Sequence, residues 1–160
     1  MPRVSEGTAY AQLDIDGGIA VGVDRSVSSV PALLAAAEEV RLRGGELHVV
    51  HAWSIRTAPR PEGCPPGAVP SLDEYQKAVR EDVGRMVANH LGERPGFPVR
   101  VHAAHSAPAR ALLNASRGAE LLVIGYPDRR GFAGLLMGVI TEQCVRYARC
   151  PVLVARHSGE

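Results

Sequence analysis

Short apolar runs alternate along the chain with segments in which apolar residues recur every three or four positions. The runs are the candidate strands: Ile19–Val23, Leu47–Trp53, Phe97–Ala104, Leu121–Ile124 and Val152–Ala155. The first run is apolar on both faces, which is typical of a central parallel strand covered on both sides. Strand and helix follow each other four times before a final strand. This order predicts an α/β fold, an open and mostly parallel sheet with helices on both faces.

The periodic segments predict four helices. Their candidate ranges are Pro31 to Arg43, Leu72 to Leu91, Ala109 to Arg117 and Val139 to Ala148. Serines at 26, 28 and 29 are of the type that caps a helix, and Ser71 is expected to cap the second helix. Leu34 and Leu72 belong to the apolar stripes, so both side chains are expected to face the core. The segment from Ser54 to Pro70, between the second strand and the second helix, contains five prolines and is expected to lack regular structure.

Composition and charge narrow the function classes. The 160 residues fit one domain, and a net charge of +1 provides no general attraction for nucleic acid or an anionic membrane. Three cysteines without CxxC spacing suggest neither a disulfide framework nor a zinc site. No apolar stretch approaches the ~18 residues of a membrane span, and cytoplasm is the expected compartment. Residues 1–17 are polar and are expected to form a flexible extension, with a short tail at 157–160.

The candidate chemistry lies where the strands end. A loop punctuated by glycines is expected from Gly125 to Gly138, with Arg129 and Arg130 inside it. Glycine lets backbone amides approach a ligand, and a helix N-terminus favours an anion, so the loop is a candidate phosphate site. Ligands in open parallel sheets bind beyond the carboxyl ends of the strands, and Asp24 also falls at that edge. Asp24 is either a ligand contact or a cap for the following helix.

Two further alternatives stay open at the sequence level. The Arg129–Arg130 pair is either an anion clamp or a solvated pair on the loop. Trp53 either stacks on a base or packs under the proline-rich segment. The DxDG pattern at Asp14–Gly17 resembles a phosphatase motif, but no buried apolar strand precedes it to aim the aspartate.

Five separated segments in the correct order resemble the universal stress protein family over about residues 18–156. They are Val21–Asp24, Leu47–Trp53, Ala119–Gly125, Gly131–Leu136 and Cys150–Val154. The resemblance implies a Rossmann-like sheet of five strands in the order 3-2-1-4-5 with four helices. It also implies a homodimer in which the last strands pair, here through Val152, Leu153, Val154 and Ala155. That strand carries no charge to protect an exposed edge.

Members of this family that bind ATP resemble one another in the motif G-x2-G-x9-G-[S/T]. Gly125 and Gly138 match its first and third glycines, whereas Asp128 replaces the second glycine and Val139 replaces the hydroxyl residue. The aspartate repels a phosphate, and the valine removes a hydrogen bond worth roughly 1.5–3 kcal/mol when the partner is charged. Both departures predict weakened binding of a triphosphate.

Other positions favour a nucleotide. Gly22, Val23, Asp24 and Ala52 match positions that line the adenine pocket in ATP-binding relatives. The positive charges of Arg129 and Arg130 partly offset the negative charge of Asp128. If Asp128 held a Mg²⁺ ion, its effect would reverse and it would favour a phosphate. The last helix is expected to begin with Val139, Ile140 and Thr141, and Thr141 offers a displaced hydroxyl.

Three hypotheses follow. The first is a universal stress protein module for regulation or interaction, with adenine-nucleotide binding impaired or lost and a protein partner still to be identified. The second is a functional ATP sensor with Mg²⁺. The third is a small nucleotide hydrolase or phosphatase built on the same cleft. For the first hypothesis we expect no catalytic residues and no metal site, and slow ATP hydrolysis stays open.

Overall fold

The computed structural model describes residues 12–126 and 132–156, with the backbone alone for 132–137. Five parallel strands form one sheet in the order β3-β2-β1-β4-β5, as the resemblance implied. The strands are β1 (Ile19–Gly22), β2 (Leu47–Ala52), β3 (Val99–Ala104), β4 (Leu121–Gly125) and β5 (Val152–Ala155). The helices are α1 (Ser29–Arg43), α2 (Leu72–Leu91), α3 (Pro108–Ser116) and α4 (Phe132–Tyr147).

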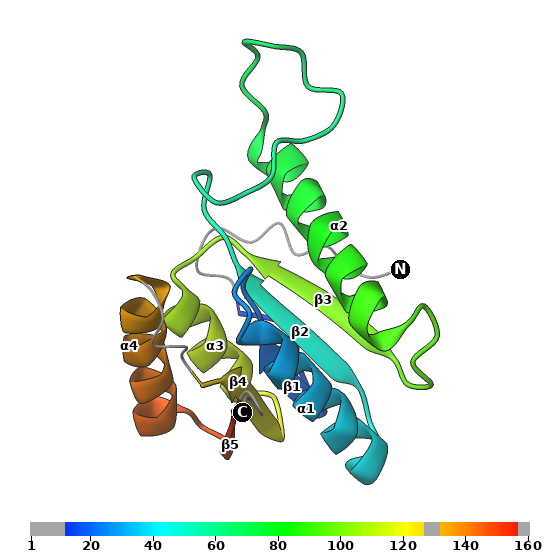
Figure 1. Cartoon of the computed structure of the whole chain (residues 1–160), viewed down its shortest axis with the longest axis vertical. Coiled ribbons are helices and arrows are strands. Elements are labelled where there is room, and N and C mark those ends of the chain that lie inside the picture. The colour runs from blue at the N-terminus through cyan, green and yellow to red at the C-terminus, as the bar shows by residue number, and fades with distance from the viewer. Residues whose placement is uncertain (1–11, 127–131, 157–160) are drawn as a thin grey trace.

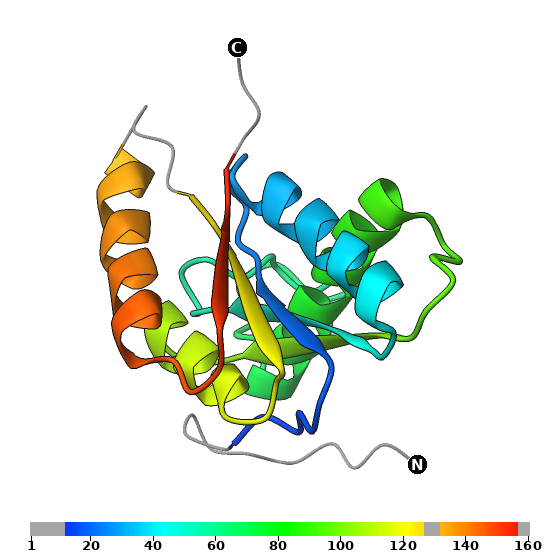
Figure 2. The same cartoon turned by 90° about the horizontal axis from the view of Figure 1, so that it is seen from below.

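Helices cover both faces of the sheet (Figures 1 and 2). Alternate residues of the central strands point to opposite layers: Ile19 and Val21 pack with α1 and α2, while Ala20 and Leu122 pack with α3 and α4. All four side chains are fully buried. The expectation of an α/β sheet covered on both faces is therefore confirmed.

The helix ends show which capping signals the chain uses. Ser71 forms a capping box with Glu74 at the start of α2, in which each side chain bonds the other residue's backbone N–H, so this prediction is confirmed. Ser28 occupies the N-cap position of α1, but its side chain makes no capping hydrogen bond.

Two core assignments are wrong, because Leu34 and Leu72 are 47% and 53% exposed. Helical spacing defines a face, and those two positions fall at its margin.

The last helix begins earlier than the glycines indicated. The expected start at Val139 is wrong, because α4 runs from Phe132 and Gly138 lies in its second turn. Only residues 126–131 remain to connect β4 with α4. Glycine disfavours a helix by about 0.5–1 kcal/mol relative to alanine, and sequence reasoning placed a loop where the chain continues the helix.

The proline-rich connection between β2 and α2 extends away from the sheet (Figure 1). It has only turns and bends, which confirms that segment 54–70 lacks regular structure. The Arg60 guanidinium organises it by donating to the carbonyls of Pro65 at 2.8 Å and Ala68 at 3.1 Å. Nowhere in the described ranges is there a helix with the length and hydropathy that a membrane span requires.

Residues 13–17, which the sequence assigns to the extension, pack against the domain. Ile15 is 7% exposed and joins the core beneath α3. The Leu13 amide donates to the Asn114 side chain at 3.0 Å, and Asp14 pairs with Arg100 at 3.2 Å. The packed part of the chain therefore starts upstream of residue 18.

Candidate functional site

A hollow opens at the carboxyl edge of the sheet, between the ends of β1 and β4. The strand order reverses at β1, since β2 lies on one side of it and β4 on the other. Such switch points are the usual ligand sites of open α/β sheets. Seven of the residues expected at the nucleotide site line the hollow: Gly22, Val23, Asp24, Ala52, Gly125, Ile140 and Thr141.

The walls of the hollow are mainly apolar. Val50 and Ile124 contribute from the strands, and Ala111 and Leu112 contribute from α3. The space open to the centre of a water molecule is about 70 Å³, several times the roughly 10–15 Å³ that one water needs. An apolar lining with a few polar groups is the usual composition of a small-molecule site.

Asp24 supplies the carboxylate of the hollow and shapes the loop that follows β1. Its Oδ1 accepts the Ser26 amide at 2.7 Å and the Ser29 hydroxyl at 2.8 Å, while its own amide donates to Ser29 Oγ at 2.7 Å. These bonds form a turn ahead of α1, so Asp24 holds the turn instead of acting as the N-cap residue. Among the described hydrogen bonds, none uses Oδ2, which leaves that oxygen for a ligand.

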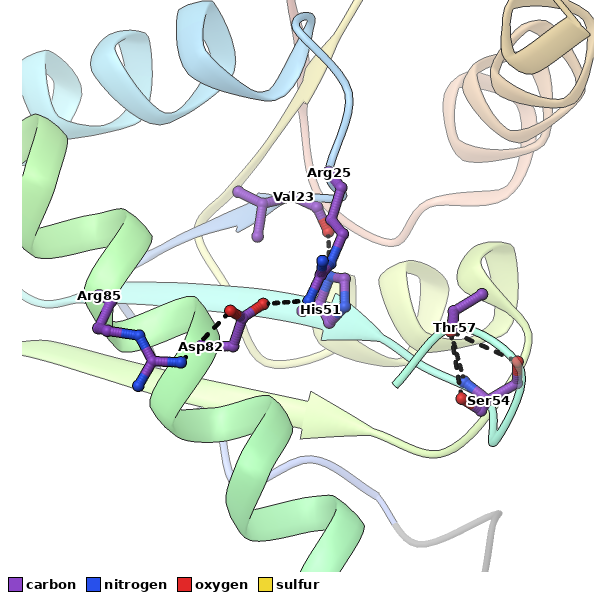
Figure 3. A network of polar contacts seen from close by, with 7 residues as sticks. All are labelled: Val23, Arg25, His51, Ser54, Thr57, Asp82 and Arg85. Carbon is purple, nitrogen blue, oxygen red and sulfur yellow. Dashed lines mark hydrogen bonds and ion pairs between the residues drawn. The ribbon is translucent and has the colours of Figure 1, made fainter. Parts of the chain in front are cut away.

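The same loop is also held from outside the hollow (Figure 3). His51 Nδ1 lies 2.9 Å from the Val23 carbonyl oxygen. Arg25, which follows Asp24, reaches α2 and pairs with Asp82 at 2.6 Å. Sequence reasoning did not identify these contacts, although the placement of His51 at the end of β2 was visible in the pattern.

Close packing explains two glycines at the hollow, Gly125 against backbone and Gly22 against the end of the Leu112 side chain. A Cβ on Gly22 would lie 2.7 Å from a Leu112 methyl carbon, and a Cβ on Gly125 would overlap the Ser28 carbonyl. Neither residue has a positive φ, so close approach and not backbone conformation explains the glycine. The match of Gly125 to a phosphate motif therefore has a structural cause that is independent of any ligand.

The rest of the expected phosphate loop is arranged differently. No atom of the described residues lies within 4 Å of a Cβ built on Gly138, and Val139 is 54% exposed on α4. Beyond the first turn of an α-helix, each N–H bonds the carbonyl four residues earlier, so neither residue offers a free amide to an anion. Asp128, Arg129 and Arg130 lie outside the described residues.

Trp53 packs into the core below the proline-rich segment, as one of the two alternatives proposed. It is 2% exposed, its Nε1 donates to Gln76 at 2.6 Å, and its ring stacks on His105 at 4.4 Å between centroids. Burial and this stacking exclude the alternative in which Trp53 stacks on a base.

A second cluster of titratable groups lies away from the hollow. His48 is 1% exposed, and its Nδ1 lies 2.9 Å from His102 Nε2. Burial lowers the pKa of His48, and burial followed by the neighbouring His48 lowers the pKa of His102 to about 4. The pair is therefore neutral at pH 7. Within the described ranges, no group of three or more His, Cys, Asp or Glu is arranged to hold a metal ion.

The residues expected at a dimer interface form β5, an outer strand of the sheet. The Pro151 carbonyl accepts a hydrogen bond from the Leu122 amide of β4, and the Ala155 carbonyl accepts one from the amide of Tyr126, which follows β4. Backbone groups alternate in direction along a parallel strand, so Val152 and Val154 direct theirs toward the outer edge. The Arg156 guanidinium lies over the Tyr126 ring at 4.2 Å and closes the end of the strand.

Comparison with known proteins identifies relatives of the fold and sequence. The profile of the Universal stress protein family matches residues 18–156. Universal stress protein Rv2005c of Mycobacterium tuberculosis is 35% identical over 140 residues, which cover 88% of this chain and 45% of that protein. Universal stress protein Rv2623 of the same organism is 34% identical over equal shares. The chain thus spans less than half the length of these relatives.

Solved structures share the architecture. A universal stress protein in complex with cAMP superposes with a TM-score of 0.62 at 24% identity, covering 90% of this chain and 98% of that one. The universal stress protein from Archaeoglobus fulgidus in complex with dAMP gives a TM-score of 0.58 at 24% identity, covering 88% and 98%. At these identities the likeness shows the fold.

Proposed function

Because the chain belongs to the universal stress protein family, we propose that it is a regulatory module whose hollow receives the adenosine part of a small nucleotide. Its hold on a triphosphate is impaired. The observation that carries the proposal is the hollow itself, at the switch point of the sheet and lined by the residues expected for an adenine pocket.

The ligand class follows from the lining. A flat aromatic base suits walls of small and branched apolar residues, and Asp24 Oδ2 is an acceptor for a sugar hydroxyl. Two proteins with this fold are described as complexes with cAMP and dAMP, both adenine nucleotides with a single phosphate. These complexes support an adenosine ligand for the same hollow.

We infer the weakened binding of the outer phosphates from the position at which α4 begins. Its early start at Phe132 uses the amides of Gly138 and Val139 within the helix. Asp128 adds a negative charge to the connection, where the repulsion of a phosphate is about 1 kcal/mol in water at contact distance. Lost hydrogen bonds and repulsion together correspond to roughly 10- to 1,000-fold weaker binding of the outer phosphates.

A functional ATP sensor is the second candidate. Thr141 lines the hollow and supplies a hydroxyl there, two residues beyond the position where the family motif has it. A hydrolase has less support, since Asp24 is the one carboxylate that the described residues contribute to the lining, and its Oδ1 already holds the loop. We propose that the module has no catalytic role.

We also propose a homodimer in which β5 pairs with β5 of a second copy. The outward backbone groups of Val152 and Val154 supply donors and acceptors, and outer strands without charged residues tend to find partners. The protein is expected to act in the cytoplasm. It is expected to regulate a protein partner by direct contact.

Calorimetric titration with adenosine, AMP, cAMP and Mg-ATP tests the ligand. We expect AMP and cAMP to bind, and ATP to bind no more than about threefold tighter than AMP. Ala52→Leu fills the hollow and should weaken binding more than tenfold. Ala104→Leu is the matched control, because Ala104 is the register partner of Ala52 on β3 and does not line the hollow.

Two outcomes would contradict the proposal in different ways. Absence of binding of every adenine compound at millimolar concentration would remove the nucleotide function. ATP binding more than tenfold tighter than AMP would show an intact phosphate hold and favour the sensor.

A further inference from the structure

The loop that forms one wall of the hollow is fixed by groups that do not line it. We call residues 23–26 the wall loop; it is the first part of the connection between β1 and α1, and its first two residues, Val23 and Asp24, line the hollow. Besides the bonds of Asp24 with Ser26 and Ser29, contacts from β2 and from α2 hold this loop. Figure 3 shows these contacts together.

Strand β2 holds both polar backbone groups of Val23. The Val23 amide donates to the Val50 carbonyl at 3.0 Å, and the Val23 carbonyl lies 2.9 Å from His51 Nδ1. A carbonyl only accepts hydrogen bonds, so chemistry assigns the imidazole hydrogen to Nδ1. The peptide that joins Val23 to Asp24 is therefore held at its carbonyl by the His51 side chain and at its amide by Ser29 Oγ.

Helix α2 holds the next residue. Arg25 Nη2 and Asp82 Oδ2 are 2.6 Å apart, and Asp82 Oδ1 lies 3.5 Å from Arg85. The Arg25 side chain is 61% exposed, and an ion pair this exposed stabilises little by itself. Its effect is directional, since it draws Arg25 toward α2 while Asp24 remains beside the hollow.

We infer that His51 is a positioning residue for this site. Its Nδ1–H holds the Val23 carbonyl and thereby sets where the Asp24 carboxylate stands in the hollow, with the Arg25–Asp82 pair as a weaker second tether. The inference deepens the proposed function and rests on it for the ligand. His51 itself does not line the hollow, so its contribution to affinity passes through the wall loop.

Two substitutions of His51 separate the hydrogen bond from the bulk of the side chain. Asparagine carries its amide nitrogen on Cγ, as histidine carries Nδ1, and keeps a donor at that distance from the backbone. Leucine has similar bulk and no donor. We expect His51→Leu to weaken AMP binding about tenfold and His51→Asn to stay within about threefold. Asp82→Asn, which leaves the fold's core untouched, should weaken binding about twofold to threefold.

A double-mutant cycle tests the route through Asp24. In an Asp24→Ala background, His51→Leu should reduce AMP affinity by less than about twofold further, because the carboxylate that it positions is absent. A general loosening of the fold would instead weaken binding equally in both backgrounds.

A measurement without ligand keeps the inference testable if AMP fails to bind. The Ser26 amide bonds Asp24 Oδ1, so its hydrogen exchange reports the order of the wall loop. We expect exchange at Ser26 to accelerate at least tenfold in His51→Leu and not in His51→Asn. Equal exchange in all three proteins, or equal AMP affinity of His51→Leu and wild type, would overturn the inference. Absence of AMP binding by the wild type, with exchange as expected, would overturn only the proposed ligand.

Discussion

No side chain fits between Gly125 and Ser28. A Cβ built on Gly125 overlaps the Ser28 carbonyl oxygen and lies 3.1 Å from the Ser28 carbonyl carbon. The end of β4 and the start of α1 thus meet backbone to backbone beside the hollow. The first glycine of the expected phosphate motif is in this way explained by packing, whether or not a phosphate binds.

Gly125→Ala is expected to destabilise the protein by about 1–3 kcal/mol, the usual range for overpacking a tight contact. Urea unfolding followed by circular dichroism measures the change. A stability equal to that of the wild type would show that the strand end and α1 move apart easily.

Gly138→Ala is expected to have the opposite effect. Gly138 lies inside α4 with nothing within 4 Å of an added Cβ, so alanine should stabilise by about 0.5–1 kcal/mol. Gly84→Ala is the matched control, because Gly84 lies inside α2 with the same open space. Both variants should keep wild-type affinity for AMP. If Gly138→Ala lost affinity for AMP and Gly84→Ala did not, Gly138 would belong to the ligand site after all.

Stability should fall with pH through the His48–His102 pair. Both pKa values lie below the unfolded value of 6.5, and that of His102 is about 4. The unfolded chain therefore binds more protons between pH 6.5 and 4, and stability is complete above this window and lost as pH falls through it. The loss from His102 is about 2–3 kcal/mol at pH 4.

Urea unfolding at several pH values checks this window. His102→Gln should flatten the curve between pH 6.5 and 4. His90→Gln, at the exposed end of α2, removes an imidazole without touching the buried pair and serves as the control. A curve of unchanged slope in His102→Gln would assign the acid sensitivity to the carboxylates instead.

The proposed dimer predicts different results for proline at neighbouring positions of β5. Val154→Pro removes an amide that points to the outer edge, so the fold should persist while the dimer dissociates. Leu153→Pro removes an amide on the side of β4 and should destabilise the monomer itself. Sedimentation velocity and circular dichroism distinguish the two results, and a Val154→Pro protein that remains dimeric would place the interface elsewhere.

The strands were predicted from short-range signals, whereas Gly22, Val23, Asp24 and Ala52 were expected at the pocket because they match positions of the family that the chain resembles. Apolar runs identify buried strands, and a polar residue such as Asp24 directly after a run marks a strand end. The early start of α4 was missed because Gly134 and Gly138 disfavour helix locally, while the fold continues it. The His51–Val23 contact joins residues 28 apart, and no local pattern reveals that pairing.

The contact between Ile15 and Gly118 bears on where the domain should be cut. A side chain at Gly118 would overlap the Ile15 carbonyl, and Gly17 donates to the Gly118 carbonyl at 2.8 Å. A chain trimmed to the family boundary at residue 18 would expose the apolar floor that Ile15 covers, at a cost of about 1.5–3 kcal/mol. We therefore expect the smallest autonomous folding unit to include residues 13–17, five residues that family resemblance alone would discard.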